Sequence, residues 1–214
     1  MPRMARVVVP GYPHHVTQRG NRRQRVFFRA QDWPHYLQLV SEACTRADTR
    51  VIAYCLMPNH VHFVMVPQHE DGLRAAIADA HRRYTRGVNL RQGWRGHLWQ
   101  ERFHSVVMDE RHLRAAIPYV ERNPVRAGLC KAVEDWPWSS AVDSGVEGCV
   151  DLVDRGLRES LVGTAASPAT AQRVACDDVI RLHTRTGRPL GDEAFVGRIE
   201  DWTGRRLRPA RRGR

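Results

Sequence analysis

The feature that most constrains the fold is a pair of β-rich runs in the first third of the chain. Val51–Met57 and Val61–Val66 are rich in β-branched and other apolar residues, and only Pro58-Asn59 and His60 separate them. Neighbouring runs of this kind most simply pair as antiparallel strands, because proline and asparagine favour turns over strand interiors. The sequence therefore predicts a sheet built around this pair.

The segments around the pair show alternating strand and helix patterns. Apolar residues recur with helical spacing in Gln31–Asp48 and in Gly72–Asn89, which predicts two helices with one buried face each. Val7–Val9 and His15–Arg19 predict two short strands or one strand interrupted around Gly11 and Pro13, and Leu98–Met108 predicts an extended segment or strand. This order predicts an α+β fold close to the ferredoxin-like pattern: a mainly antiparallel sheet with helices packed on one of its faces.

A third helix is predicted over Arg111–Arg122. Asp109 can cap its N-terminus, and Pro124 disfavours helical geometry in the residue before it, so the helix should end near residue 123. Pro118 lies inside this segment. It removes one backbone donor and clashes with the carbonyl of Arg114, so we expect the helix to kink or to restart near residue 119.

The charge of the chain predicts a nucleic-acid partner. The net charge is +11, and of 34 basic residues only Lys131 is a lysine. Residues 1–30 carry seven arginines and residues 202–214 carry six, and neither segment contains an acid. Arginine binds phosphate with two parallel hydrogen bonds and stacks on bases. A preference for arginine over lysine could reflect base composition of the genome, but the excess of positive charge could not.

Other features exclude some classes of protein. No apolar run approaches the ~18 residues needed to cross a bilayer, and the N-terminus lacks the apolar core of a signal peptide. We therefore expect a cytoplasmic, nucleoid-associated protein with no membrane partner. Five scattered cysteines without a Cys-x-x-Cys pair argue against a disulfide framework and against a structural zinc site.

A His-x-His pattern in the second β-rich run is the first candidate for chemistry. In an extended strand the side chains of His60 and His62 point to one side while Val61 points to the other. Two imidazoles on one strand face can hold a divalent metal ion. The pattern arises often by chance, however, so it is weak evidence without further residues.

Tyr119 and Asn123 supply such residues. They are four apart in the predicted third helix and so share one face. A tyrosine hydroxyl can act as a nucleophile, and an amide oxygen suits a hard cation such as Mg²⁺ or Mn²⁺ as a third ligand. Two neutral imidazoles and a neutral amide leave the charge of the metal uncancelled, which favours a phosphate oxygen as the next ligand.

Five separated segments share their order with one known family. The sequence resembles the single-tyrosine HUH transposases, most closely the REP-associated tyrosine transposases with their IS200-like domain. The resemblance covers about residues 5–141 and rests on the segments His15–Arg23, Leu56–His62, Leu98–Phe103, Tyr119–Leu129 and Trp136–Ser140.

This resemblance implies a mechanism and a substrate. His60 and His62 would be the HUH metal ligands and Asn123 the third. Tyr119 would attack the scissile phosphate, giving a 5′-phosphotyrosine link and a free 3′-hydroxyl, and a second 3′-hydroxyl could reverse the step. The substrate would be single-stranded DNA with imperfect hairpins, such as REP-like palindromes, and the protein would act as a monomer or a homodimer.

Several residues are candidates for contacts with this DNA. We place them after the first strand, on the predicted helix 72–89 and beside the last strand, where family members have a lysine in place of His104. Tyr84 lies among the helix arginines without a ligand residue four positions later, so we interpret it as a packing residue. The candidates are Arg19, Asn21, Arg22, Arg23, Arg82, Arg83, Arg86, Arg102 and His104.

We divide the chain into three parts. Residues 1–141 form the transposase catalytic domain, residues 142–168 a linker, and residues 169–214 a small helical extension with an arginine-rich tail that orders on DNA. The extension contains predicted helices at Thr170–Thr184 and Asp192–Trp202, which lack the turn signature of a helix-turn-helix.

Two alternatives from other classes remain open at this stage. The first is a protein that binds DNA or RNA hairpins but has lost cleavage, which the position of Pro118 favours and the intact His, Tyr and Asn set disfavours. The second is a metallohydrolase with a water nucleophile. It requires more carboxylate or histidine ligands, and Glu70 and Asp71 follow too far along the chain to share a strand with His60 and His62.

Overall fold

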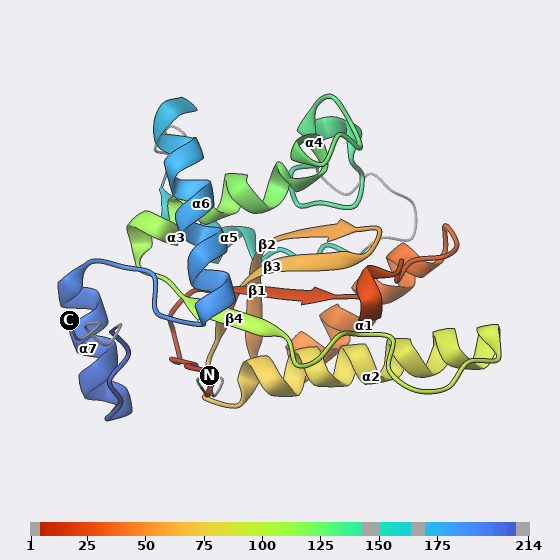
Figure 1. Cartoon of the computed structure of the whole chain (residues 1–214), viewed down its shortest axis with the longest axis horizontal. Helices are drawn as coiled ribbons and strands as arrows, with labels where there is room; N and C mark the ends of the chain where they lie inside the picture. The colour runs from red at the N-terminus through yellow and green to blue at the C-terminus, as the bar shows by residue number, and fades with distance from the viewer. Residues whose placement is uncertain (1–4, 143–149, 164–169, 209–214) are drawn as a thin grey trace, which may run out of the picture.

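The protein is built on a four-stranded antiparallel sheet, seen at the centre of Figure 1. The computed structural model describes residues 5–142, 150–163 and 170–208. The strand order is β2-β3-β1-β4, and each neighbouring pair is antiparallel. The strands are β1 (His14–Arg19), β2 (Thr49–Met57), β3 (His60–Pro67) and β4 (His104–Val107). With one helix after β1 and one after β3, this is the predicted ferredoxin-like α+β arrangement.

Helices α1 (Asp32–Arg46) and α2 (Gly72–Gln92) cover one face of the sheet. Their apolar sides pack on alternate residues of the strands, such as Val61 and Phe63, to form the larger hydrophobic core. Tyr36 of α1 and Tyr84 of α2 are buried there. The helical spacing predicted from the sequence for these two segments is confirmed, with α2 extending three residues beyond Asn89.

The other face of the sheet is also covered, so the prediction of helices on one face only is wrong. Helix α3 (Glu110–Glu121), followed by the short α4 (Asn123–Arg126), packs on it together with α5 (Arg155–Val162) and α6 (Thr170–Thr186). A second core forms there, because the strand residues that alternate with those of the first core are apolar too, among them Val64 and Val106.

The segment predicted as a linker, residues 142–168, contains helix α5. Asp154 caps its N-terminus by accepting a hydrogen bond from the backbone N–H of Leu157, and Leu157 and Leu161 pack against the second core. The linker interpretation is therefore wrong for this helix, because its apolar residues find a buried surface that composition alone does not reveal. Residues 143–149 and 164–169 of that segment lie outside the described residues, as does the end of the arginine-rich tail.

Two predicted strands are shorter than expected or absent. Val7 and Val9 are buried against Phe195 and Ile199 of α7 (Glu193–Thr203), but residues 7–9 form no strand. Pro10, which has no N–H to donate to a sheet, follows directly. In the segment 98–108 only β4 is a regular strand, because Glu101 adopts a positive φ of 55° that interrupts the extended backbone. None of the described helices is both long and apolar enough to span a bilayer.

Candidate active site

A cavity of about 520 Å³ opens beside the histidines of β3, on the face of the sheet that carries α3 and α6. Strands β1, β3 and β4, the segment before β4 and the two helices all contribute to it. We call it the catalytic cavity. It is lined by His15, Thr17, Gln18, Arg19, Arg23, His60, His62, Gln100, Glu101, His104, Tyr119, Arg181, Thr184 and Arg185.

The register of the sheet explains why these side chains meet. Thr17 of β1 lies opposite His62 on one side and opposite His104 on the other, so the three residues form one row across three strands. His60 lies two residues before His62 and shares its face. Val61 points the other way and is buried in the first core, as the sequence predicts.

His15, which the sequence analysis did not single out, is a hydrogen-bond partner of His62. Its Nε2 lies 3.0 Å from His62 Nδ1, and its Nδ1 lies 3.0 Å from the hydroxyl oxygen of Thr184 on α6. The hydroxyl of Thr184 donates its hydrogen to the carbonyl of Ile180 at 2.7 Å. Thr184 must therefore accept from His15 Nδ1–H, because a hydroxyl has only one hydrogen to give.

The direction of this hydrogen-bond chain fixes the tautomer of His62. If neutral His15 carries its hydrogen on Nδ1, its Nε2 accepts, and His62 Nδ1–H donates to it. The Nε2 of His62 is then unprotonated. His60 reaches the same state by another route, since its Nδ1 donates to the amide oxygen of Asn59 at 2.6 Å. Both histidines thus present a free Nε2 lone pair, which is what metal coordination requires.

Burial and nearby cations keep these imidazoles neutral. Burial, reinforced by Arg19 and Arg126, lowers the pKa of His60 to about 3. The pKa of His15 is lowered to about 3 by burial and by Arg126. Burial, followed by the neighbouring His60, also lowers the pKa of His62. All three side chains are therefore uncharged at neutral pH, the form in which histidine binds metal ions.

Tyr119 lies beside this pair on the inner side of α3. Its ring is edge-on to His15 and to His62, with centroid separations of 5.7 Å and 6.1 Å. Helix α3 runs through Pro118 to Glu121, so the predicted restart near residue 119 is wrong. The turn after the proline is closed, since the N–H of Arg122 donates to the Pro118 carbonyl at 3.0 Å.

Asn123, the predicted third metal ligand, does not line the catalytic cavity. Its amide nitrogen donates to the carbonyls of Tyr119 and Val120, and its oxygen accepts from the Arg126 guanidinium at 2.6 Å. Arg126 also lies over the Tyr119 ring at 4.4 Å and pairs with Asp177 of α6 at 3.2 Å. In this arrangement the amide oxygen is already bound to a cation, so of the three predicted ligands His60 and His62 alone offer free donors.

These two imidazoles fit part of a metal site. In the part of the chain that the structure describes, no cluster of three His, Cys, Asp or Glu side chains is arranged to hold a metal ion. A complete site for a hard cation would therefore need oxygen ligands from elsewhere, such as Asn123 after release from Arg126 or a phosphate oxygen of a substrate.

The predicted DNA-contacting residues divide into three groups. Arg19, Arg23 and His104 line the catalytic cavity, while Asn21 and Arg22 belong with Arg23 to the adjoining short 3₁₀ helix (Asn21–Arg23). Arg82, Arg86 and Arg102 line a second cavity. Arg83 belongs to neither cavity.

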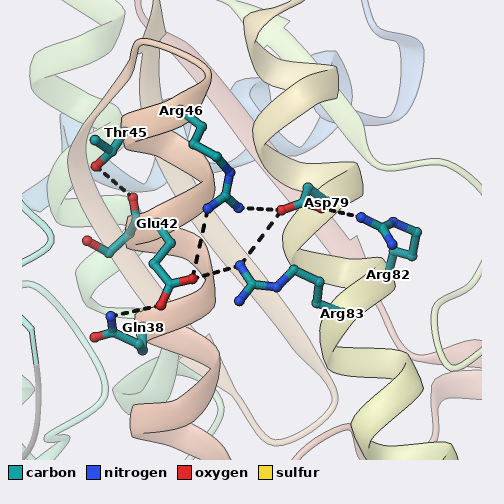
Figure 2. Close-up of polar contacts among 8 residues, drawn as sticks. Gln38, Glu42, Thr45, Arg46, Asp79, Arg82 and Arg83 are labelled. Atoms are coloured by element: carbon teal, nitrogen blue, oxygen red, sulfur yellow. Dashed lines mark hydrogen bonds and ion pairs between the residues drawn. The ribbon is translucent and has the colours of Figure 1, made fainter.

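Arg83 instead joins a cluster of ion pairs between α1 and α2. In Figure 2 its guanidinium lies between the two helices, 2.8 Å from Glu42 and 3.8 Å from Asp79. Asp79 also binds Arg46 at 2.6 Å and Arg82 at 2.5 Å. These carboxylates already neutralise much of the charge of the arginines, which makes this surface a weaker phosphate binder than the count of arginines suggests.

Arg181 and Arg185 are cavity residues that the sequence analysis missed. They come from α6, in the segment interpreted as an extension, and lie on the same helical face as Thr184. Helical spacing of two arginines was visible in the sequence, but nothing there indicates that this helix packs over the histidines.

The family model described as "Transposase IS200 like" matches residues 8–123, which run from the N-terminal segment through β4 and α3. The chain belongs to the IS200-like transposase family. The matched region contains His60, His62, Tyr119 and Asn123, whereas α6 with Thr184 lies beyond it.

Individual relatives agree with this family. The chain is 30% identical over 110 residues to a REP-associated tyrosine transposase of Haemophilus influenzae, and the match covers 46% of this chain and 62% of the relative. It is 27% identical over 89 residues to a REP-associated tyrosine transposase of Escherichia coli K12, covering 41% and 52%. These matches span between half and two thirds of the relatives.

A solved structure shares the fold of this chain. The structure of a REP-associated tyrosine transposase bound to a REP hairpin superposes with a TM-score of 0.57. The match covers 65% of this chain and 82% of that one, at 21% sequence identity.

Proposed function

We propose that this transposase cleaves and rejoins single-stranded, hairpin-bearing DNA through a covalent link to Tyr119. The observation that carries the proposal is the position of Tyr119, edge-on to His62 in a cavity whose two β3 histidines present free Nε2 lone pairs. A nucleophile, two metal donors and four arginines (Arg19, Arg23, Arg181 and Arg185) thus line one cavity.

The cleavage step is a transesterification between Tyr119 and the DNA strand. The Tyr119 oxygen forms a bond to the scissile phosphorus, the bond from phosphorus to the 3′ oxygen breaks, and the tyrosine proton ends on that oxygen. The product is a 5′-phosphotyrosine link and a free 3′-hydroxyl. A second 3′-hydroxyl can attack the link and release Tyr119, so no external energy source is needed.

The two histidines would hold a Mg²⁺ or Mn²⁺ ion, with Asn123 as the predicted third ligand. When bound, such an ion supplies Lewis-acid activation of the phosphate. The arginines would position the strand through its phosphates. The solved relative bound to a REP hairpin supports a DNA hairpin as the substrate class.

A denaturing gel tests the proposal. The full chain is incubated with Mn²⁺ and a labelled hairpin oligonucleotide that carries single-stranded flanks. A protein–DNA adduct that resists denaturation is expected with wild type and absent with Tyr119→Phe or after chelation. Cleavage that persists in Tyr119→Phe would contradict a tyrosine mechanism.

Tyr84→Phe is the matched control. Tyr84 is also buried, but on the other face of the sheet, where its hydroxyl donates to the Val26 carbonyl at 2.7 Å. Its loss removes one buried tyrosine hydroxyl without touching the catalytic cavity, so the adduct should still form. Failure of both variants would point to a loss of folding instead of a loss of the nucleophile.

The hydrogen bond from Arg126 to Asn123 favours a second candidate, a hairpin-binding protein without cleavage. With the amide oxygen held at 2.6 Å by a guanidinium, the third metal ligand is not free. In that case the chain would still bind the labelled hairpin on a native gel, while no adduct formed on the denaturing gel with Mg²⁺ or Mn²⁺. Recovery of the adduct in Arg126→Ala would show that the amide oxygen needs only to be released.

A further inference from the structure

A second cavity, of about 620 Å³, lies between α2 and the segment 97–103 that leads into β4. Figure 1 shows the stretch between α2 and β4 running back along the helix. We call this cavity the aromatic pocket. It shares Gln18 and Glu101 with the catalytic cavity, so the two hollows adjoin on either side of these residues.

Flat side chains dominate the lining of the aromatic pocket. Trp99 stacks on His81 of α2, with ring centroids 4.1 Å apart and an angle of 16° between the rings. The guanidinium of Arg6 lies 3.5 Å above the ring of Phe103. Aromatic and guanidinium planes are the surfaces on which proteins stack unpaired bases.

Two buried polar atoms of the aromatic pocket have no hydrogen-bond partner among the described residues. They are the indole N–H of Trp99 and the amide oxygen of Gln18. The two residues are 7% and 3% exposed, respectively. The orientation of the Gln18 amide is fixed, because its nitrogen donates to the carbonyls of Gln100 and Glu101 at 2.9 Å and 3.1 Å.

Such orphaned groups are rare, because a buried polar atom without a partner costs stability. Both belong to side chains that line one hollow, and together they offer one donor and one acceptor. The edge of a nucleobase carries the complementary pair, an acceptor beside a donor. The edge of a base therefore supplies the kind of partner that each of these two atoms lacks.

Positive charge at the aromatic pocket matches a phosphate. Arg86 and Arg102 are exposed and line the pocket, and no carboxylate pairs with either among the described residues. Their neighbours Arg74 and Arg82, by contrast, are paired with Asp71 and Asp79. The two unpaired arginines are therefore the ones available to an anionic ligand.

We propose that the aromatic pocket binds one unpaired nucleotide of the DNA strand whose scissile phosphate lies in the catalytic cavity. The base meets Trp99 and Gln18, and its phosphate meets Arg86 and Arg102. This inference rests on the proposed function. It assigns recognition of one base to a place separate from the reacting phosphate, with Gln18 and Glu101 forming the wall between them.

The test uses binding in EDTA, so that cleavage plays no part. Fluorescence anisotropy measures the affinity of the full chain for a hairpin oligonucleotide and for a set in which each flanking nucleotide in turn is abasic. One abasic position is expected to weaken binding by wild type about tenfold. In Trp99→Phe, which keeps a ring but loses the indole N–H, the intact oligonucleotide should bind more weakly and the penalty at that position should shrink.

Arg102→Ala supplies a second variant in case Trp99→Phe disturbs folding. It should weaken binding several-fold more than Arg111→Ala, which removes an exposed arginine on α3 that lines neither cavity. The pocket proposal is overturned if every abasic position costs the same in wild type and Trp99→Phe, or if Arg102→Ala and Arg111→Ala bind alike. If the abasic penalty shrinks in Trp99→Phe as expected but no adduct forms on the denaturing gel, only the proposed cleavage is overturned.

Discussion

The two faces of the sheet use the same strands in different ways. On the face under α1 and α2, β3 contributes Val61, Phe63 and Met65 to a core of interlocking apolar side chains. On the face under α3 and α6, the same strand begins with His60 and His62 before it becomes apolar at Val64. Strand alternation alone separates the packing residues from the polar ones.

The difference teaches how a sheet can carry buried polar groups without losing its core. On the polar face the side chains satisfy one another in a directed chain from His62 through His15 and Thr184 to a helix carbonyl. The apolar face needs no such direction, because packing is insensitive to donor and acceptor order. Substitutions on the apolar face should therefore cost stability, and those on the polar face should cost metal binding.

The sharpest contrast is between neighbours, Phe63→Ala and His62→Ala. Phe63 is fully buried, and its truncation should lower the free energy of unfolding by about 3–5 kcal/mol. His62→Ala should destabilise the protein less but remove one of two free metal donors, so Mn²⁺ binding should be lost. Urea unfolding measures the first effect and calorimetric titration with Mn²⁺ the second. Equal losses of stability in both variants would erase the distinction between the faces.

A second contrast concerns His14 and His15, which are adjacent on β1 but point to opposite faces. His14 accepts from the backbone N–H of Val9 and donates to the Tyr12 carbonyl, so its role is structural. Burial lowers its pKa to about 4 from an ordinary value of 6.5. In the unfolded chain His14 is therefore protonated as the pH falls below 6.5, whereas in the folded protein it stays neutral until about pH 4.

Stability from His14 should thus be fully present above pH 6.5 and decline as the pH falls toward 4. The loss amounts to about 3 kcal/mol over that window, since each pH unit is worth about 1.4 kcal/mol. His14→Gln cannot titrate, so its free energy of unfolding should fall less steeply in acid. The histidines common to both proteins cancel in the difference. Parallel curves for the two proteins would rule out this role.

The same contrast shows what the sequence could predict. Alternation and helical spacing are local, and they correctly give the four-stranded fold, the opposite orientations of His62 and Val61, and the cap at Asp109. The link from His15 to Thr184 spans 169 residues and depends on where α6 packs, which no local pattern encodes.

Asn123 marks another limit of sequence reasoning. Its spacing from Tyr119 places it one helical turn further on, at the start of α4, but the direction of its amide depends on Arg126, three residues later. An arginine at that spacing could equally have pointed to solvent. Helix α5 was not predicted for a related reason: its few apolar residues are stabilised by packing against the second core, and the local sequence does not show that contact.

Thr184 offers a smaller and more specific test of the polar face. Thr184→Val keeps the shape of the side chain but removes the acceptor for His15 Nδ1–H, so His15 and His62 lose their fixed tautomers. Metal affinity should fall about 10–100-fold, as is typical when such supporting groups are removed. Thr184→Ser keeps the hydroxyl and should bind Mn²⁺ nearly as wild type does.

Long-range ¹H–¹⁵N spectra of the metal-free protein give a readout apart from affinity. In wild type and Thr184→Ser, His62 should carry its hydrogen on Nδ1, whereas Thr184→Val should show a mixture. A single Nδ1–H form of His62 in all three proteins would mean that Thr184 does not set the direction of the hydrogen bonds through His15 to His62.

The smallest expected effect lies outside both cores, in the ion-pair cluster of Figure 2. Arg83→Ala removes the contacts to Glu42 and Asp79 between α1 and α2. Partly exposed pairs are worth about 0–1 kcal/mol, so the free energy of unfolding should change by no more than that. Hairpin affinity should also change little, because Arg83 lines neither cavity. Arg19→Ala, at the catalytic cavity, should weaken hairpin binding clearly more in the same anisotropy assay. If Arg83→Ala weakened it as much as Arg19→Ala, the outer surface of α2 would have to be counted with the DNA-binding residues, as its arginines alone suggest.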